Sequence, residues 1–431
     1  MRQAAGQARG PVGMTRLVVG VIVGLGAGLL VGCQEAGPTS SGGRVDVTPG
    51  PRAVGEPVMK PPDPAKVWPP RAVWVVRETY ESPEQIAELM DRCRDTGFNT
   101  VLFQVRGNGT AFYRSQIEPL AYEYRNGDPG FDPLEVACRE AHRRGLALHA
   151  WLNVLPAWRG GKAPTDARQL YNARPDWFLY DQKGERQPLN PTFYVSLNPC
   201  LPAVRAYLVS VFVDIAKRYP VDGLHMDYIR FPIEVSPRGS DYPHDRQTLE
   251  LYRKSGGKDP LKEKAAWTRW RVAQVTQLTR QIREATRRAR RGIRLTAACA
   301  PDIEGARERY YQDGPAWLRD GLIDAVFVMN YTADNAQFAR RQETWRRAAS
   351  GGLVAPGISP GIPGNRSDEV TIEQLKLADR WGHGFAVFSA SSLFSDRPRS
   401  RQCLEALRPV LQAIQSRKVA DRGGAGTRED G

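Results

Sequence analysis

The sequence has few of the residues on which metal and redox chemistry depend. It holds only five histidines among 431 residues, no HExxH motif, and no pair of cysteines at CxxC spacing. Its six cysteines include Cys33, which leaves an odd number for pairing. The sequence therefore predicts neither a bound metal nor a cofactor, and carboxylates remain as the groups for catalysis.

Near the N-terminus lies a hydrophobic run that is short for a membrane span. It extends from Leu17 to Leu30, is rich in glycine and ends in the letters LVGC at Cys33. This length is typical of the apolar core of a signal peptide. The ending resembles the lipobox of bacterial lipoproteins, which implies a signal peptide over 1–33, a lipid on Cys33 and attachment to a membrane of the cell envelope. An ordinary signal peptide or short anchor is the alternative.

Composition divides the rest of the chain into three parts. Residues 34–70 are rich in Pro, Gly, Ser and Thr, which predicts a flexible tether. Residues 71–416 have the apolar patterning of a folded domain, and the polar residues 417–431 are predicted to be a disordered tail. The formal charge of +14 favours anionic surfaces or polymers. Because export removes access to nucleic acid, we expect a wall or lipid surface instead.

Eight strand-like runs alternate with helical patterns, which is typical of repeated βα units. The runs lie near Arg71–Val76, Thr100–Val105, Ala147–Asn153, Gly223–Phe231, Arg294–Ala300, Ala325–Tyr331, Leu353–Ile358 and Gly384–Ser389. Eight such units predict an α/β fold, a (β/α)₈ TIM-type barrel with insertions in the loops after strands 3 and 4. A doubly wound open sheet is the alternative, but the turn at 77–81 lacks the glycines that commonly bind phosphate there.

Catalytic groups of such barrels lie at the C-terminal ends of the strands. In the fourth run, alternation places His225 and Asp227 on one face, and Leu224 and Met226 on the other. The polar pair is therefore expected to face the barrel axis. Because a buried polar pair is costly unless it is used, Asp227 is the main catalytic candidate. A structural ion pair with Arg230 is the alternative role of this aspartate.

Further candidates follow the other strands. Asp302 after the fifth run and Glu78 after the first are candidates for a second catalytic carboxylate. A turn or helix cap is the alternative role of Asp302. Aromatic and hydrogen-bonding side chains at strand ends suit sugar rings and hydroxyl groups. The predicted substrate-binding residues are His225, Tyr228, Asn330, Tyr331, Trp151, Asn153, Arg106 and Trp74.

Several segments resemble one family, the glycosyl hydrolase-like family 10 lipoproteins. They are Arg71–Val75, Phe103–Arg106, Ala111–Ser115, Pro129–Leu134, His149–Asn153, Leu197–Pro199, Val221–Gly223 and His383–Phe388. The family includes a divisome-localised enzyme that acts on peptidoglycan stripped of its peptides, so the resemblance implies a glycan substrate. The family's fourth strand typically reads Asp-Gly-Ile-His-Phe-Asp-Asp-Tyr. The matching run supplies His225, Asp227 and Tyr228, with one Asp where many relatives have two.

The fourth run also resembles the Asp-rich strand of chitinase-type enzymes, but Ile229 stands where those enzymes have a glutamate. We expect a glycoside hydrolase that cleaves a β-linked amino-sugar polymer, denuded peptidoglycan first, with Asp227 as general acid or acid/base. Retaining, inverting and substrate-assisted mechanisms stay open. One alternative is a non-catalytic glycan-binding lipoprotein. The other is a polysaccharide deacetylase or amidohydrolase, which needs a metal that five histidines do not favour.

Overall fold

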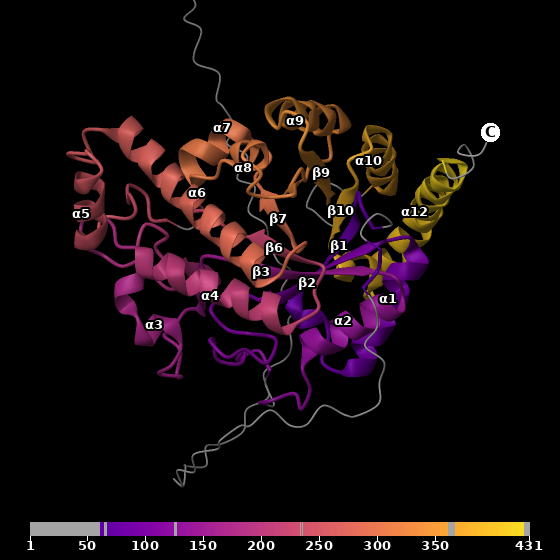
Figure 1. Ribbon diagram of the computed structural model, residues 1–431, viewed down its shortest axis with the longest axis horizontal. Coiled ribbons are helices and arrows are strands. Elements are labelled where there is room, and N and C mark those ends of the chain that lie inside the picture. The colour runs from indigo at the N-terminus through magenta and orange to yellow at the C-terminus, as the bar shows by residue number, and fades with distance from the viewer. Residues whose placement is uncertain are drawn as a thin grey trace, which may run out of the picture. The chain divides into compact units, whose positions relative to one another are not determined.

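All eight predicted runs form strands of one parallel barrel. In the computed structural model these are β1 (Arg71–Val75), β2 (Thr100–Arg106), β3 (Ala147–Asn153), β6 (Gly223–Asp227), β7 (Arg294–Cys299), β8 (Ala325–Val328), β9 (Leu353–Ile358) and β10 (Phe385–Phe388). They close in the order β1-β10-β9-β8-β7-β6-β3-β2 (Figure 1). The predicted TIM-type (β/α)₈ fold is therefore confirmed, because every βα unit returns the chain to the same end of the barrel.

The structure describes residues 61–63, 67–124, 127–232, 234, 236–360 and 367–425. The predicted signal peptide, Cys33 and most of the predicted tether lie outside the described residues. Among those described, no helix is long and apolar enough to cross a membrane.

Helices surround the barrel, and their ends follow local sequence signals. The longer ones are α1 (Pro83–Thr96), α2 (Pro133–Arg143), α4 (Pro202–Arg218), α6 (Lys264–Ala289), α9 (Asn335–Ala348), α10 (Asp368–Trp381) and α12 (Pro398–Ala425). Ser82 caps α1 by accepting a hydrogen bond from the Gln85 N–H, and Gly97 ends the helix in the left-handed conformation. Asp132 caps α2 in the same way.

Side chains that alternate along the strands form two apolar layers. Those pointing into the barrel form a small cluster that consists of Ala72, Trp74, Leu102, Trp151, Phe327, Ala355 and Ala386. Those pointing outward, Leu224 and Met226 among them, join the larger core beneath the helices. The barrel interior is therefore packed, as expected for eight strands.

Insertions extend the C-terminal end of the barrel, the end at which the strands finish. After β3, the strands β4 (Pro156–Gly160) and β5 (Asn190–Ser196) form a separate antiparallel sheet, with α3 (Leu170–Ala173) and the 3₁₀ helix η2 (Pro175–Trp177) between them. After β6, the helix α5 (Arg246–Lys254) precedes α6. Both insertions were predicted. A third long connection, residues 107–132 after β2, was not.

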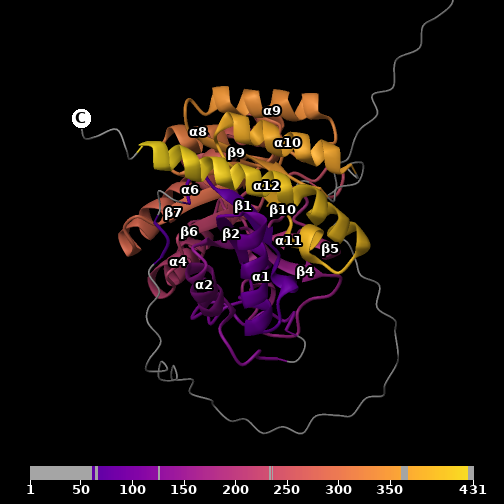
Figure 2. The same ribbon diagram turned by 90° about the vertical axis from the view of Figure 1, so that its right-hand side faces the viewer.

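The last part of the chain packs outside the barrel. Short elements α7 (Ile303–Gly305), η4 (Ala306–Tyr310) and α8 (Gly314–Arg319) follow β7, and α11 (Ala390–Phe394) follows β10. Figure 2 shows α12 lying along α10 and α11. Because α12 continues to Ala425, helical backbone extends into the segment 417–431 that was predicted to be disordered.

The five described cysteines are all free and buried.

Candidate active site

Asp227 is the last residue of β6, and the backbone turns sharply after it. Tyr228 has φ +48°, a left-handed conformation that is uncommon for a residue with a bulky side chain. In this turn the Tyr228 N–H donates to Asp227 Oδ1 at 2.7 Å. The carboxyl group is therefore held in one orientation by the residue that follows it, and the strained turn marks the position as a functional candidate.

Burial changes the acidity of Asp227. The residue is 7% exposed, and burial raises the pKa of its carboxyl from 3.8 to about 6, although Arg230 and the Tyr228 N–H act in the opposite direction. Arg230 forms its ion pair with Glu234. The alternative in which Arg230 neutralises Asp227 in a structural ion pair is therefore not what the structure shows. Asp227 can hold a proton at mildly acidic pH.

Two aromatic residues complete the surroundings of Asp227. Burial raises the pKa of the Tyr331 phenol, and the charge of Asp227 raises it further, so the two groups lie close together. The side chain of Trp151 is 4% exposed, and a hydrogen bond from it to the Asp227 carboxyl also acts to lower the pKa of that group. The substrate-binding role of Tyr228, Tyr331 and Trp151 stays a prediction.

His225 lies deeper in the barrel than Asp227, and its two ring nitrogens are satisfied internally. Nε2 accepts a hydrogen bond from the Trp74 indole at 3.1 Å, and Nδ1 lies 2.9 Å from Thr296 Oγ1. Burial lowers the pKa of this histidine well below its usual value, so the ring is neutral. Trp74 is 2% exposed and packs against Phe327. The prediction that His225 and Trp74 bind substrate is corrected to a packing role.

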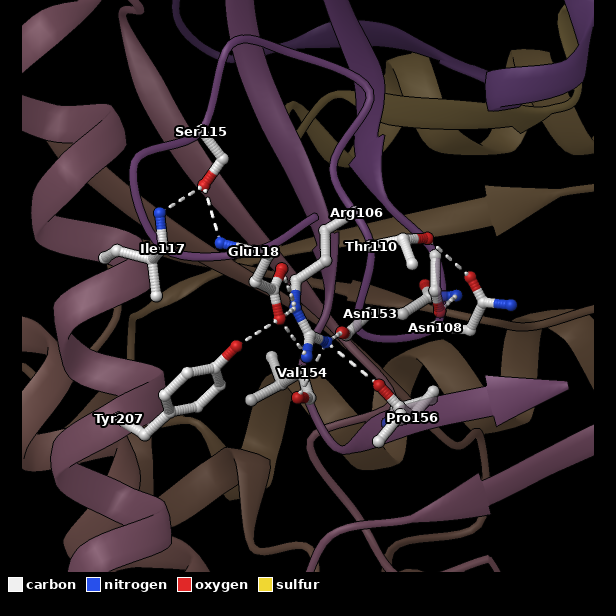
Figure 3. A network of polar contacts seen from close by, with 12 residues as sticks. Arg106, Asn108, Thr110, Ser115, Ile117, Glu118, Asn153, Val154, Pro156 and Tyr207 are labelled. Carbon is white, nitrogen blue, oxygen red and sulfur yellow. Dashed lines mark hydrogen bonds and ion pairs between the residues drawn. The ribbon is translucent and has the colours of Figure 1, made fainter. Parts of the chain in front are cut away.

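Arg106 is also buried completely, in an ion pair with Glu118 (Figure 3). Its Nε lies 2.9 Å from Glu118 Oε2, and the Tyr207 hydroxyl donates to Glu118 Oε1 at 2.9 Å. The same guanidinium donates to the carbonyl oxygens of Asn153, Val154 and Pro156. With all of its donors directed inward, Arg106 does not reach substrate, and the prediction that it binds substrate is corrected.

The backbone segment 153–156, to which Arg106 donates its hydrogen bonds, also contacts the turn that contains Asp227. The Val154 N–H donates to the Asp227 carbonyl oxygen at 2.8 Å, and the Leu155 N–H donates to the Tyr228 carbonyl oxygen at 3.4 Å. The ion pair with Glu118 therefore positions the backbone on both sides of the Asp227 turn.

The two predicted amides are buried as well. Asn153 accepts from Gln104 Nε2 at 3.2 Å and donates to the Gly107 carbonyl oxygen at 3.1 Å. Asn330 is fully buried and donates to the Phe338 carbonyl oxygen at 2.9 Å, while its Oδ1 has no partner among the described residues. Asn153 therefore has a structural role, and Asn330 keeps one free acceptor.

Neither predicted second carboxylate lies in a buried environment. The side chain of Asp302 is 61% exposed, with Arg309 at 3.7 Å. The side chain of Glu78, in the 3₁₀ helix η1 (Arg77–Thr79), is 49% exposed, with Arg77 at 3.8 Å. Surface ion pairs of this kind contribute little energy. Neither residue thus has the buried environment that distinguishes Asp227.

A carboxylate that sequence analysis missed has such an environment. Glu123 comes from the connection after β2, its side chain is 15% exposed, and its Oε2 is buried without a hydrogen-bond partner in the described structure. Burial raises the pKa of Glu123, whereas Arg77 lowers it. No strand or helix signal precedes this residue. Its place after Tyr122 in an aromatic-rich loop was the only available hint.

A chain of polar contacts joins Glu123 to the end of β6. Glu123 Oε1 accepts from Arg77 Nε at 3.3 Å, and Arg77 Nη1 donates to Gln104 Oε1 at 3.1 Å. Gln104 in turn contacts Asn153, which is the register partner of Asp227 on the adjacent strand. Glu123 and Asp227 therefore belong to the same end of the barrel. Burial raises the pKa of both carboxyl groups at that end.

Comparisons with known proteins concern the family and the fold of this chain. The family model described as Glycosyl hydrolase-like 10 matches residues 69–356. The chain is 28% identical over 297 residues to glycosyl hydrolase YngK of Bacillus subtilis, which covers 61% of this chain and 54% of that protein. It is also 28% identical over 297 residues to glycosyl hydrolase DigH of Escherichia coli strain K12, with 63% of this chain and 64% of that protein covered. The chain thus spans about half to two thirds of the length of these relatives.

Solved structures show the same fold at lower identity. The glycoside hydrolase domain of PgaB (BpsB) from Bordetella bronchiseptica has a TM-score of 0.56 at 18% identity, covering 79% of this chain and 98% of that one. The catalytic domain of β-amylase from Paenibacillus polymyxa has a TM-score of 0.54 at 11% identity, covering 79% and 97%. At these identities the likeness concerns the barrel fold.

Proposed function

Because the chain belongs to the glycosyl hydrolase-like 10 family, we propose that it hydrolyses the glycan strands of peptidoglycan from which the peptides have been removed. Asp227 is the general acid or acid/base of this proposal. The observation that carries it is the buried carboxyl of Asp227, whose pKa is raised to about 6 at the end of a barrel strand. The names of YngK and DigH as glycosyl hydrolases support a glycan as the substrate class.

The proposed chemistry breaks the bond between the anomeric carbon and the glycosidic oxygen. Asp227 Oδ1 accepts the Tyr228 N–H, so the proton is assigned to Oδ2. That proton passes to the departing glycosidic oxygen, which leaves as a sugar hydroxyl, and Asp227 becomes a carboxylate. Water supplies the oxygen that ends on the anomeric carbon, and its proton restores an acidic group in the site.

Glu123 takes the place of Asp302 and Glu78 as the proposed second carboxylate. Its support is its burial, its unpartnered Oε2 and the polar contacts that lead to the neighbour of Asp227. In this role it receives a proton from water or attacks the anomeric carbon itself. An inverted product identifies the first role and a retained product the second.

For the N-terminal segment we propose lipid attachment at Cys33 and residence in the cell envelope. The apolar run from Leu17 to Leu30 and the LVGC ending support this. Metabolic labelling with a fatty-acid analogue is expected to mark the wild-type protein and to leave Cys33→Ser unlabelled. Equal labelling of both proteins would place the lipid elsewhere.

The hydrolytic activity is tested on purified cell-wall sacculi, intact and stripped of peptides by an amidase. Released glycan fragments are measured by mass spectrometry for the wild type, Asp227→Asn and the matched exposed control Asp302→Asn. We expect fragments from stripped sacculi with the wild type and the control, and none with Asp227→Asn. No release by the wild type from either substrate contradicts the peptidoglycan proposal, and release by Asp227→Asn at the wild-type rate contradicts the role of Asp227.

A further inference from the structure

A cluster of arginines lies at the end of the barrel opposite Asp227. Helix α6 ends at Ala289, and the chain enters the start of β7 at Arg294. Arg287, Arg288 and Arg291 are exposed in this connection, and no ion pair is formed by them within the described ranges. Since strands of the barrel are parallel, the start of β7 lies at the end away from the last residue of β6.

The end of α4 enlarges this cluster. Helices α4 and α6 lie side by side (Figure 1), and Arg290 joins their ends by donating to the carbonyl oxygens of Tyr219 and Val221. Lys217 is exposed there and forms no ion pair among the described side chains. The nearby Asp214 is already paired with Arg218. One more acid, Glu284, is exposed on α6 one turn before Arg287 and Arg288, so the basic side chains of this end still outnumber the acidic ones near them.

The general preference for basic residues at helix C-termini does not by itself explain this cluster of exposed, unpaired basic side chains. Basic residues near a helix C-terminus are stabilised by the helix dipole, and most helices of this barrel have one. At α1 and α2 these residues pair with acids, as Arg94 does with Asp95 and Arg143 with Glu140. Arg291 differs in two ways, because it lies beyond the end of α6 and has no acidic partner in the described part of the chain.

The N-terminal segment enters the barrel at this same end. The guanidinium of Arg294 lies 4.0 Å from the centre of the Trp68 ring, and β1 begins three residues after Trp68. The apolar run that ends before Cys33 precedes this entry point in the sequence. Cys33, the proposed site of lipid attachment, lies 35 residues before Trp68 in the sequence. An anchor in the N-terminal segment thus keeps this end near the anchoring surface.

We propose that Lys217, Arg287, Arg288 and Arg291 dock on an anionic phospholipid surface. Guanidinium groups bind phosphate oxygens through paired N–H donors, and lipid headgroups present such oxygens in a plane. The docked barrel directs its Asp227 end away from the membrane, toward polymer outside it. This orientation goes beyond the proposed hydrolysis and does not depend on it.

The test measures binding of the full-length chain to phosphatidylcholine vesicles with and without phosphatidylglycerol, at low and high salt. All proteins carry Cys33→Ser, so that no lipid anchor contributes. One variant removes three charges of the cluster. A matched variant removes three exposed charges near the start of α12, with Arg397 just before the helix and Arg401 and Arg408 within it, and none of them forms an ion pair among the described residues. The substitutions are R287Q/R288Q/R291Q and R397Q/R401Q/R408Q.

We expect phosphatidylglycerol-dependent binding that high salt abolishes. The cluster variant should bind on the order of 100-fold more weakly than the parent, whereas the α12 variant should bind nearly as well. Thermal unfolding checks that both variants are folded. If the triple variant is not folded, Arg291→Gln alone should weaken binding by roughly fivefold.

Three results overturn the proposal. If both triple variants lose vesicle binding to the same extent, the binding depends on net charge and not on the cluster. If the parent binds equally well without phosphatidylglycerol, the anionic headgroup is not what the protein binds. Cluster-dependent binding to soluble polyphosphate, without binding to vesicles, assigns the surface to a dissolved polyanion. Asp227→Asn should bind vesicles like the parent, so a failure of docking and a failure of hydrolysis are distinguished.

Discussion

Replacing Asp227 by asparagine is expected to abolish hydrolysis and to make the folded protein more stable above pH 6. The reason is the cost of ionising a buried carboxyl. In the unfolded chain Asp227 has an ordinary pKa near 3.8, and in the folded protein its pKa is about 6. Asparagine has no charged form, so the substitution removes this cost while its side-chain oxygen can still accept the Tyr228 N–H.

The sign and size of the effect follow from proton linkage. Between pH 3.8 and about 6 the folded protein keeps a proton that the unfolded chain has lost, so the wild type loses stability as the pH rises through this window. A difference of about two pKa units corresponds to about 3 kcal/mol. At 7% exposure solvent screening is small, and 3 kcal/mol is an upper bound because the asparagine amide must also be accommodated. At roughly 2 °C per kcal/mol, the unfolding temperature should rise by up to about 6 °C.

Thermal unfolding of the wild type and Asp227→Asn at about pH 4 and about pH 8 measures this difference, with Asp302→Asn as the control. Asp302 is mostly exposed, so its substitution should change the unfolding temperature little at either pH. The gain for Asp227→Asn should be present at the higher pH and nearly absent at the lower one. A gain of equal size at both values, or no gain at the higher one, would refute the argument that Asp227 is a carboxyl with a raised pKa.

Three further predictions concern catalysis and the support of the site. The kcat of the wild type should fall as the pH rises through about 6, because Asp227 then loses its proton; a kcat that stays constant from about pH 5 to pH 8 contradicts the general-acid role. Glu123→Gln should lower kcat by about 100-fold or more, whereas Glu78→Gln should change it little. A large loss of kcat in Glu78→Gln with little loss in Glu123→Gln would support Glu78 as the second carboxylate, as predicted from sequence. Glu118→Ala should cost about 3–5 kcal/mol in denaturant unfolding, because it leaves the Arg106 charge buried and unpaired. A cost near that of a surface substitution argues against the buried ion pair.

The barrel could be predicted from sequence because its signals are local. Each strand is a short apolar run, several helices begin at a capping residue, as α1, α2 and α9 do, and eight repeats permit few topologies. Alternation along β6 also placed Leu224 and Met226 correctly in the outer core and pointed Asp227 the other way. A period of two residues decides the face of a strand from adjacent positions alone.

Depth and exposure could not be predicted in this way. His225 and Asp227 share a face, yet the first is enclosed between Trp74 and Thr296 while the second ends the strand. Asp302 stands at a strand end, as expected of a catalytic group, and is exposed to solvent. Position along a strand does not state which other strands and loops cover a side chain.

What the sequence by itself determined was the alternation of strands and helices, and with it the end of the barrel at which Asp227 lies. Only the tertiary structure decided that Glu118 neutralises Arg106 and that Glu123 joins the polar network beside Asp227. Both glutamates come from an irregular connection whose path follows no periodic rule. Their partners are set by long-range packing, which also buries Asp227 and so raises its pKa.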